Sequence, residues 1–238
     1  MIIIIKQKHS IQILFIIKII FFTPKNRFPL DFKILTYYPI HHSHNKYLGS
    51  KTMTESQKKL SFEFFPTRTP EGRAKQILTR KQLRQYNPEF FSCTSGAGGS
   101  TRDGTMQAIE DILSEGVAAA PHLACVGMEK HELISLLQEY KTMGIRHIVA
   151  LRGDIPSGVG SGMSGLRYAN ELVSLIKNEF DNDFHIEVAA YPEYHPQARS
   201  AEDDLNNFVR KAKAGADSAI TQYFYNADAY FRFVDDAR

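Results

Sequence analysis

From residue 60 onward, short apolar runs alternate with amphipathic stretches. Residues 131–143 are a clear amphipathic case, because Leu133, Leu136, Leu137 and Tyr140 recur at helical spacing. The run at 145–151 contains Ile148, Val149, Ala150 and Leu151 in succession, and a run this short and β-branched is typical of a strand buried on both faces. The apolar runs recur about every 30 residues, at 60–65, 89–94, 118–126, 145–151, 185–191 and 218–225. This alternation predicts an α/β fold with a parallel sheet wound by right-handed crossovers.

The strand-to-helix turns distinguish between the two common parallel architectures. No GxGxxG turn follows the first predicted strand, which disfavours a dinucleotide-binding doubly wound sheet. We therefore predict a (β/α)8 TIM barrel of which this chain holds only about six βα units. The sixth helical stretch, NADAYFRFVDDAR, ends at Arg238. We accordingly expect a fragment that lacks two strands and has two open sheet edges.

Residues 1–52 differ in composition from the rest of the chain. Their apolar block, residues 11–22, is interrupted by Lys18 and is shorter than the roughly 20 residues of a spanning helix. No small-residue cleavage site follows it, as a signal peptide would require. Met53 then opens a stretch of ordinary composition. We interpret 1–52 as a disordered or irregular extension that arises from a mis-called start, and 53–238 as the partial barrel.

Charge and cysteine content narrow the functional classes. The net charge of +3 conceals an uneven distribution, since residues 1–52 carry eight Lys or Arg and one acid, Asp31. The predicted domain is therefore mildly acidic, which disfavours a nucleic-acid partner. Cys93 and Cys125 both lie in predicted strands, outside any CxxC or metal-ligand spacing. We expect a cytoplasmic protein with a reduced core, no membrane segment and no nucleic-acid partner.

Polar residues stand at the carboxyl end of every predicted strand. In a parallel barrel these ends meet on one face, where ligands bind. Any one of them alone is equally well a capped turn or a solvated side chain. Glu63 lies among Phe62, Phe64 and Phe65, and we expect this aromatic setting to raise its pKa and to suit it to act as an acid. The set comprises Glu63, Thr94, His122, Arg152, Asp154, Glu193, His195 and Gln222.

Three weaker patterns leave alternatives open. His122, Asp154 and His195 could ligate a metal, which would indicate a metal-dependent barrel hydrolase. The glycine-rich GAGGS at 96–100 could bind an anion or could simply connect a strand to a helix. On the fifth crossover, four residues share one helical side that could bind a diphosphate or could be a solvated face, namely Asp204, Asn207, Arg210 and Lys211.

Several longer motifs occur together in a fixed order. They are SFEFFPTRTPEG, TSGAGGSTRD, APHLACVG, GIRHIVALRGD, VAAYPEYHPQA, KAGADSAITQYFY and DAYFRFVDDAR. In order and spacing they resemble bacterial methylenetetrahydrofolate reductase from about residue 60 to residue 238. The resemblance implies a (β/α)8 barrel with FAD, which takes hydride from a reduced nicotinamide and reduces 5,10-methylenetetrahydrofolate to 5-methyltetrahydrofolate.

The resemblance also implies roles for particular residues. Glu63 matches the general acid, Asp154 matches the carboxylate near flavin and folate, and Gln222 matches a substrate contact. All three are thus implied to contact substrate. The resemblance implies no metal ion. It favours NADH over NADPH as the hydride donor, and it implies a homo-oligomer for the full-length protein. Flavin contacts carry over to Thr94, His122, Arg152, Gly153, Asp154, Tyr168, Tyr191, His195, Asp204, Asn207, Arg210 and Lys211.

This chain departs from the family pattern at three motif positions. Thr67 replaces a proline, Ser95 replaces an aromatic residue near the flavin, and Ala124 replaces a threonine. Because the loss at Ser95 and the expected absence of two strands both affect the pocket, we expect this chain to bind FAD poorly and to turn over little. An inactive truncated gene product is the non-enzymatic alternative.

Overall fold

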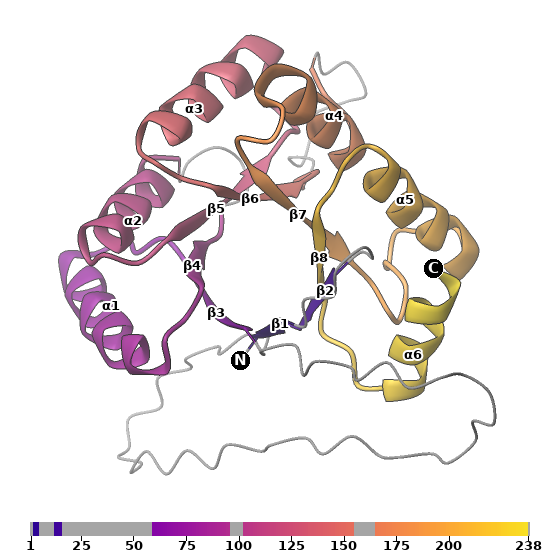
Figure 1. Cartoon of the computed structure of the whole chain (residues 1–238), viewed down its shortest axis with the longest axis horizontal. Helices are drawn as coiled ribbons and strands as arrows, with labels where there is room; N and C mark the ends of the chain where they lie inside the picture. Colours follow the sequence, from indigo (N-terminus) through magenta and orange to yellow (C-terminus); the bar gives the residue numbers. More distant parts are fainter. Residues whose placement is uncertain (1, 5–11, 16–58, 96–101, 155–164, 238) are drawn as a thin grey trace, which may run out of the picture.

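Eight strands form a closed barrel in the computed structural model, which describes residues 2–4, 12–15, 59–95, 102–154 and 165–237 (Figure 1). Around the barrel the strands follow the order β1-β2-β8-β7-β6-β5-β4-β3. Their bounds are β1 Ile2–Ile4, β2 Gln12–Phe15, β3 Lys59–Phe64, β4 Phe90–Cys93, β5 Ala119–Ala124, β6 His147–Leu151, β7 His185–Ala190 and β8 Ser218–Thr221.

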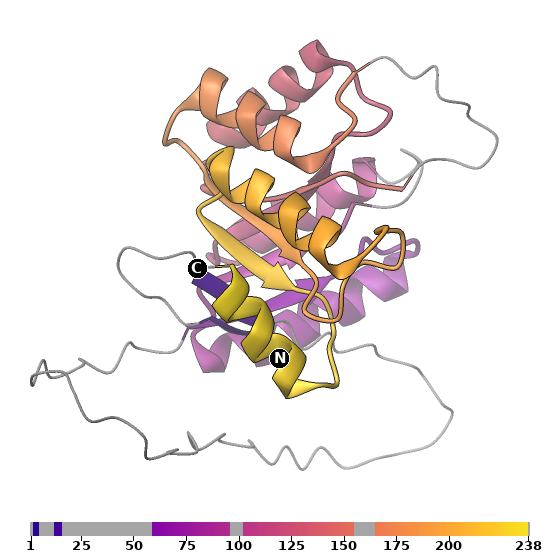
Figure 2. The ribbon, with the colours of Figure 1, turned by 90° about the vertical axis from the view of Figure 1, so that its right-hand side faces the viewer.

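Strands β3 to β8 are mutually parallel, and a helix follows each of them, which confirms the six predicted βα units. Figures 1 and 2 show these helices on the outside of the strands. A short 3-10 helix, Arg84–Tyr86, extends the first helix. The helices are α1 Pro70–Leu83, α2 Arg102–Ser114, α3 Lys130–Thr142, α4 Ala169–Phe180, α5 Ala201–Lys213 and α6 Ala227–Asp236.

The barrel is closed by β1 and β2, which lie between β3 and β8 (Figure 1). Strand β1 pairs antiparallel with β3, and β2 pairs parallel with β8. The two open edges that we expected are therefore covered. Residues 2–4 and 12–15 are strands within the segment for which we expected no regular structure, and the rest of residues 1–52 lies outside the described residues.

The two faces of each strand pack against different partners, because side chains alternate along a strand. Phe62, Phe64 and Phe91 belong to the main core beneath the helices. A second, smaller cluster of four buried residues contains Phe90 and Val149. Polar residues Ser61, Ser92, His122, Glu187 and Ser218 are buried as well. The small cluster and these polar residues alternate with the main-core positions, which places them toward the barrel interior.

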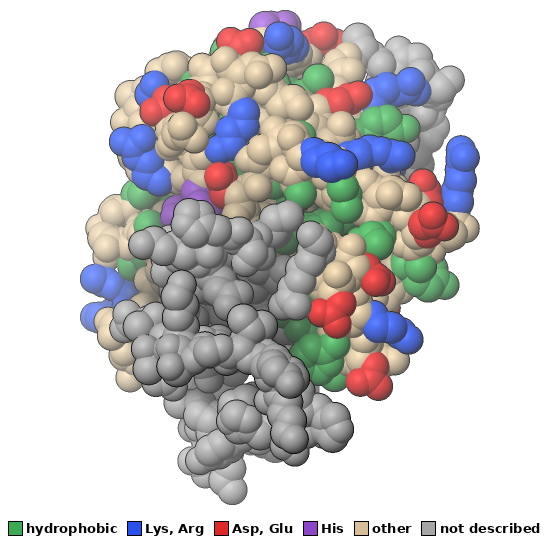
Figure 3. All heavy atoms as spheres, turned by 45° about the vertical axis from the view of Figure 1, so that its right-hand side comes forward, with side chains coloured by type: hydrophobic (Ala, Val, Ile, Leu, Met, Phe, Trp, Pro, Cys, Tyr) green, Lys and Arg blue, Asp and Glu red, His purple; other side chains and the backbone are tan. Residues whose placement is uncertain are grey.

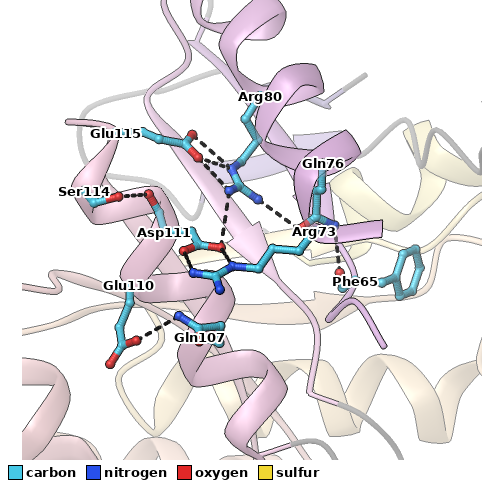
Figure 4. A network of polar contacts seen from close by, with 9 residues as sticks. All are labelled: Phe65, Arg73, Gln76, Arg80, Gln107, Glu110, Asp111, Ser114 and Glu115. Carbon is cyan, nitrogen blue, oxygen red and sulfur yellow. Dashed lines mark hydrogen bonds and ion pairs between the residues drawn. The ribbon is translucent and has the colours of Figure 1, made fainter. Parts of the chain in front are cut away.

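Helices α1 and α2 are joined by a partly buried ionic network (Figure 4). The Arg80 side chain is fully buried, and its Nε and Nη2 donate to Glu115 at 3.0 and 2.6 Å. Its Nη1 donates to Gln76 Oε1 at 2.9 Å, and its guanidinium lies 5.6 Å from the Phe64 ring centroid. Arg73 makes two hydrogen bonds to Asp111, at 2.9 and 2.7 Å. The first two helices are thus fixed to one another by paired charges.

Both cysteines are buried free thiols, as predicted for a reduced core. Burial raises the pKa of Cys93 to about 12 and that of Cys125 to about 11. Since the thiolate is the reactive form, both groups are chemically inert near neutral pH.

The face of the molecule near α5 and α6 mixes hydrophobic, basic and acidic side chains (Figure 3). Tyr225, just before α6, and Phe231, within α6, are both highly exposed. Within the described part of the chain, no helix combines the length and apolar character needed to cross a bilayer.

Candidate active site at the carboxyl end of the barrel

Glu63 and His122 face one another inside the mouth of the barrel. Glu63 lies on β3, and His122 lies on β5, two strands away in the sheet. Their side chains are each 8% exposed, with His122 Nε2 3.7 Å from Glu63 Oε2. Between them, on β4, Ser92 is level with Glu63, and its buried hydroxyl has no hydrogen-bond partner among the described residues. A carboxyl group, an imidazole and a hydroxyl therefore lie on neighbouring strands and are largely shielded from solvent.

The environment of Glu63 differs from the aromatic one that the sequence suggested. Phe62 and Phe64 lie on the opposite face of β3, where both rings contact Phe91. Phe65 lies beyond the end of the strand and is 45% exposed. Phe62 and Phe64 therefore do not supply the aromatic setting that we expected for Glu63, because neighbours in sequence point to opposite faces of a strand. The neighbours that the structure gives Glu63 on its own face include Ser92 and His122.

Arg152 and Gly153 directly follow β6. Gly153 has φ +85°, and a Cβ at this position would lie 2.8 Å from the Ala124 Cβ. Only glycine fits such a backbone without displacing β5. Arg152 Nε donates to the Gly153 carbonyl at 3.3 Å, and Arg152 Nη2 donates to Gln197 Oε1 at 2.8 Å. The segment after β6 thus presents a guanidinium at the carboxyl end of this strand, followed by the exposed Asp154.

Gln197 is a positioning residue that sequence reasoning missed. It lies in the loop after β7, and its amide oxygen fixes the Arg152 guanidinium while its backbone N–H donates to His195 Nδ1 at 3.0 Å. It stands in the motif YPEYHPQA, two residues after His195. That spacing allows a local side-chain-to-backbone turn, which is the signal that could have identified it.

Tyr191 and His195 pack together at the carboxyl end of β7. Their ring centroids are 4.6 Å apart at 76°. The His195 backbone N–H donates to Asp204 Oδ2 at 3.1 Å, which ties this loop to α5. Burial and the Asp204 charge raise the pKa of Tyr191, whereas the Arg152 charge opposes this rise. Tyr191 therefore lies within electrostatic reach of both Arg152 and Asp204.

The four α5 residues that the sequence placed on one helical side are divided in the structure. Asp204 is buried, and Lys211 donates from Nζ to the Ala189 carbonyl of β7 at 2.5 Å. Burial lowers the pKa of Lys211 to about 8, and Asp204 partly opposes this shift. Arg210 is exposed, and its Nη1 donates to Asn207 Oδ1 at 2.5 Å. Lys211 and Asp204 therefore face the barrel, whereas Arg210 lies toward solvent.

Glu193 connects the loops that follow β7 and β8. Its Oε1 accepts hydrogen bonds from the backbone N–H groups of Tyr225 and Asn226, at 2.9 and 2.8 Å. Asn226 is in turn the N-cap of α6. Gln222 is exposed just after β8, and its Oε1 accepts from the Tyr223 N–H at 3.0 Å. Gln222 therefore borders the same end of the barrel.

The remaining predicted flavin contacts occupy the margin of this region. The Thr94 backbone bonds to Phe64, and its carbonyl accepts from the Thr105 hydroxyl at 3.0 Å. Tyr168 is the N-cap residue of α4 and is 55% exposed. The GAGGS loop lies outside the described residues.

The described residues do not support the metal-ligand set proposed from sequence. His122 faces Glu63, and His195 Nδ1 accepts from Gln197, whereas Asp154 is exposed. Within the described ranges, one group of side chains has metal-ligand spacing, and it contains none of these three residues. The hydrolase alternative therefore has no ligand cluster among the described residues.

Comparison with known proteins decides the family. The family model described as methylenetetrahydrofolate reductase matches residues 49–238. The chain belongs to the methylenetetrahydrofolate reductase family. This confirms the resemblance inferred from the motifs.

Curated relatives carry the same name. The chain is 46% identical over 182 residues to 5,10-methylenetetrahydrofolate reductase of Escherichia coli (strain K12), which covers 76% of this chain and 60% of that protein. Identity to the reductase of Pectobacterium carotovorum is 42% over 197 residues, covering 82% and 64%. The Arabidopsis thaliana protein named methylenetetrahydrofolate reductase (NADH) 1 is 35% identical over 204 residues, covering 79% and 34%. The chain thus spans less than two thirds of the length of these reductases.

A solved structure titled "QR15, an Aldolase" aligns with a TM-score of 0.45 and 14% identity, covering 68% of this chain and 67% of that one. Nothing about the reaction follows from this alignment.

Proposed function

We propose that this protein takes part in the FAD-dependent reduction of 5,10-methylenetetrahydrofolate to 5-methyltetrahydrofolate by a reduced nicotinamide. The observation that carries the proposal is the Glu63–His122 pair, which lies enclosed in the barrel mouth of a chain that belongs to the reductase family. We favour NADH as the donor, and the name of the Arabidopsis relative supports that choice. The proposal further includes a cytoplasmic location, small-molecule substrates and a homo-oligomer for the full-length protein.

The chemistry of the side chains around β6, β7 and α5 fits FAD. Arg152 and Lys211 provide cations of the kind that bind a diphosphate. Tyr191 and His195 provide flat rings beside them, as a stacked ring system requires. FAD supplies the hydride-transfer chemistry when bound. We propose that Thr94, His122, Gly153, Asp154, Tyr168, Asp204, Asn207 and Arg210 complete its contacts.

Glu63 is proposed as the proton donor. Reduction requires the methylene bridge of the folate to open, and the nitrogen that leaves the methylene carbon needs a proton. Glu63 is enclosed, and the His122 imidazole 3.7 Å away can stabilise the carboxylate once that proton has left. Opening of the bridge leaves a cation on the remaining nitrogen, which the Asp154 carboxylate is suited to stabilise. Gln222 is proposed as a further substrate contact.

The experiment separates two half-reactions in Glu63→Gln. Oxidation of NADH by bound flavin needs no proton donor at the folate, so loss of flavin absorbance on adding NADH should be unchanged. Reduction of methylenetetrahydrofolate should slow by about 10²- to 10⁴-fold, the usual contribution of a general acid. The matched control is Glu110→Gln, which changes an exposed carboxylate on α2.

Equal loss of both half-reactions in Glu63→Gln would contradict the proposed acid, since it would indicate disturbed flavin binding. Full folate reduction by that variant would also contradict it. If the unsubstituted protein retains no flavin, the proposal that it binds FAD is contradicted. Comparison of kcat/KM for NADH and NADPH tests the preferred donor.

A further inference from the structure

A second polar cluster lies at the opposite, amino-terminal end of the barrel. His147 and His185 are the first residues of β6 and β7 and are paired in the strand register. His147 Nδ1 lies 2.9 Å from Glu187 Oε1, and His185 Nε2 lies 3.7 Å from the same oxygen. The ligand atoms of the three side chains all lie within 4.8 Å of one another. Two imidazoles and a carboxylate therefore converge on one point.

The contacts of the Glu187 carboxylate offset only part of the free-energy cost of burying it. The Glu187 side chain is 2% exposed, and its Oε2 has no hydrogen-bond partner among the described residues. A buried carboxylate with an unpaired oxygen is costly unless a cation or a proton neutralises it. The Glu187 carboxylate can therefore take one more partner, and a cation would neutralise its charge.

We propose that His147, His185 and Glu187 bind a divalent transition-metal ion of the zinc class. Two imidazole nitrogens and one carboxylate oxygen form a donor set that suits Zn²⁺. Ligands about 2.1 Å from a tetrahedral ion are separated by about 3.4 Å. The two separations from Glu187 Oε1, 2.9 and 3.7 Å, bracket this value, so small side-chain rotations close the site.

The fourth coordination position has suitable surroundings. The Ser218 hydroxyl, at the start of β8, lies 2.9 Å from His185 Nε2 and can hold a metal-bound water or give way to the ion. The His185 side chain is 34% exposed and that of His147 is 20% exposed, which gives an ion access from solvent. An ion here would join the amino ends of β6 and β7. The site is independent of the proposed reductase chemistry, because Glu63 and Arg152 lie toward the other end of their strands.

The test measures zinc and cobalt binding by the whole chain, without flavin or substrate. Because His41, His42 and His44 could bind metal by themselves, all protein is prepared with these three histidines replaced by Asn. Chelator-treated protein is titrated with Zn²⁺, and the metal content is measured after gel filtration. A second titration with Co²⁺ follows the visible absorption that tetrahedral coordination produces. The test variants are His185→Gln and Glu187→Gln, and the control is His131→Asn, an exposed histidine of α3.

We expect one Zn²⁺ per chain in the background protein and in the His131→Asn control, with affinity at least about tenfold lower in His185→Gln and Glu187→Gln. The thermal midpoint of the background protein should rise with added Zn²⁺, since binding to the folded state stabilises it. His185 is partly exposed at the start of its strand, so His185→Gln should keep the native circular dichroism spectrum. Absence of bound zinc, or zinc and cobalt binding that both variants retain in full, would overturn the proposal.

Discussion

Arg80 and Lys211 are both cations withdrawn from water, but their partners differ. The Arg80 guanidinium is fully buried between α1 and α2 and is bonded to Glu115 and Gln76, with Asp111 3.9 Å away. The Lys211 ammonium donates to a backbone carbonyl, and Asp204 is the opposing charge that acts on it. Carboxylates therefore neutralise Arg80 at close range, whereas Lys211 is left with a lowered pKa.

The difference separates a structural charge from a functional one. A cation bonded to carboxylates at short range contributes to stability and has little capacity for another anion. A cation that is desolvated but incompletely neutralised is typical of a binding site. On this criterion the region around Lys211, at the carboxyl end of β7, is the better candidate for anion binding.

The largest effect is expected for Arg80→Met. Removal of the guanidinium leaves Glu115 and Asp111 poorly solvated beside it, and we expect the free energy of unfolding to fall by about 3 to 5 kcal/mol. Denaturant unfolding measures this change. Flavin binding at saturating FAD should persist while the variant is folded. A variant as stable as wild type would show that the network contributes no net stability.

The next effect is a pH dependence that originates in Lys211. Its pKa is about 8 in the folded protein and 10.5 in a solvated side chain, so the unfolded chain binds more protons between these values. Stability from this group therefore rises with pH, by at most about 3 kcal/mol between pH 7 and 10.5. Lys211→Met should lack this rise. Because other groups titrate in both proteins, the measured quantity is the difference between their unfolding free energies, and a difference independent of pH would contradict the assignment.

A smaller effect is expected for flavin affinity in Lys211→Met. Under the proposed function the ammonium contributes a charge-assisted contact to the diphosphate, and its loss should weaken FAD binding about tenfold, or roughly 1.4 kcal/mol. Titration of flavin fluorescence gives this value. Riboflavin, which has no phosphate, is the control ligand and should bind both proteins equally. Equal weakening for FAD and riboflavin would indicate a general loss of the pocket.

The smallest effect should follow Arg73→Met. Its bonds to Asp111 have good geometry, but the Arg73 side chain is 45% exposed and is hydrated when unpaired. We expect a thermal midpoint close to that of wild type. A loss as large as that of Arg80→Met would show that pairing geometry, rather than burial, determines the stability of the network.

The barrel itself could be predicted from sequence, because the spacing of apolar runs reports directly on βα units. Strand β6 and helix α3 follow from the runs around Ile148 and Leu133. The closure by β1 and β2 could not be predicted, since the composition of residues 1–52 differs from that of the domain and its pairing partners are distant in the chain. Register between distant strands depends on tertiary contacts that a local pattern does not contain.

The candidate site was predictable in position and less so in detail. The polar ends of strands do meet, as the Glu63–His122 pair shows. The environment of Glu63 was mistaken because neighbours in sequence were taken as neighbours in space. The cluster of His147, His185 and Glu187 could not be predicted from the carboxyl ends of the strands, because its members lie in the amino-terminal halves of β6 and β7. A histidine beginning each of two adjacent strands was the available signal.

The Glu193 carboxylate has a consequence for motion at the barrel mouth. It accepts two backbone N–H groups from the segment after β8 while belonging to the segment after β7. Amides 225 and 226 should therefore exchange with deuterium more slowly than is usual for so exposed a loop. A molecule that displaces one of the two loops must therefore either break both of these hydrogen bonds or carry the other loop with it.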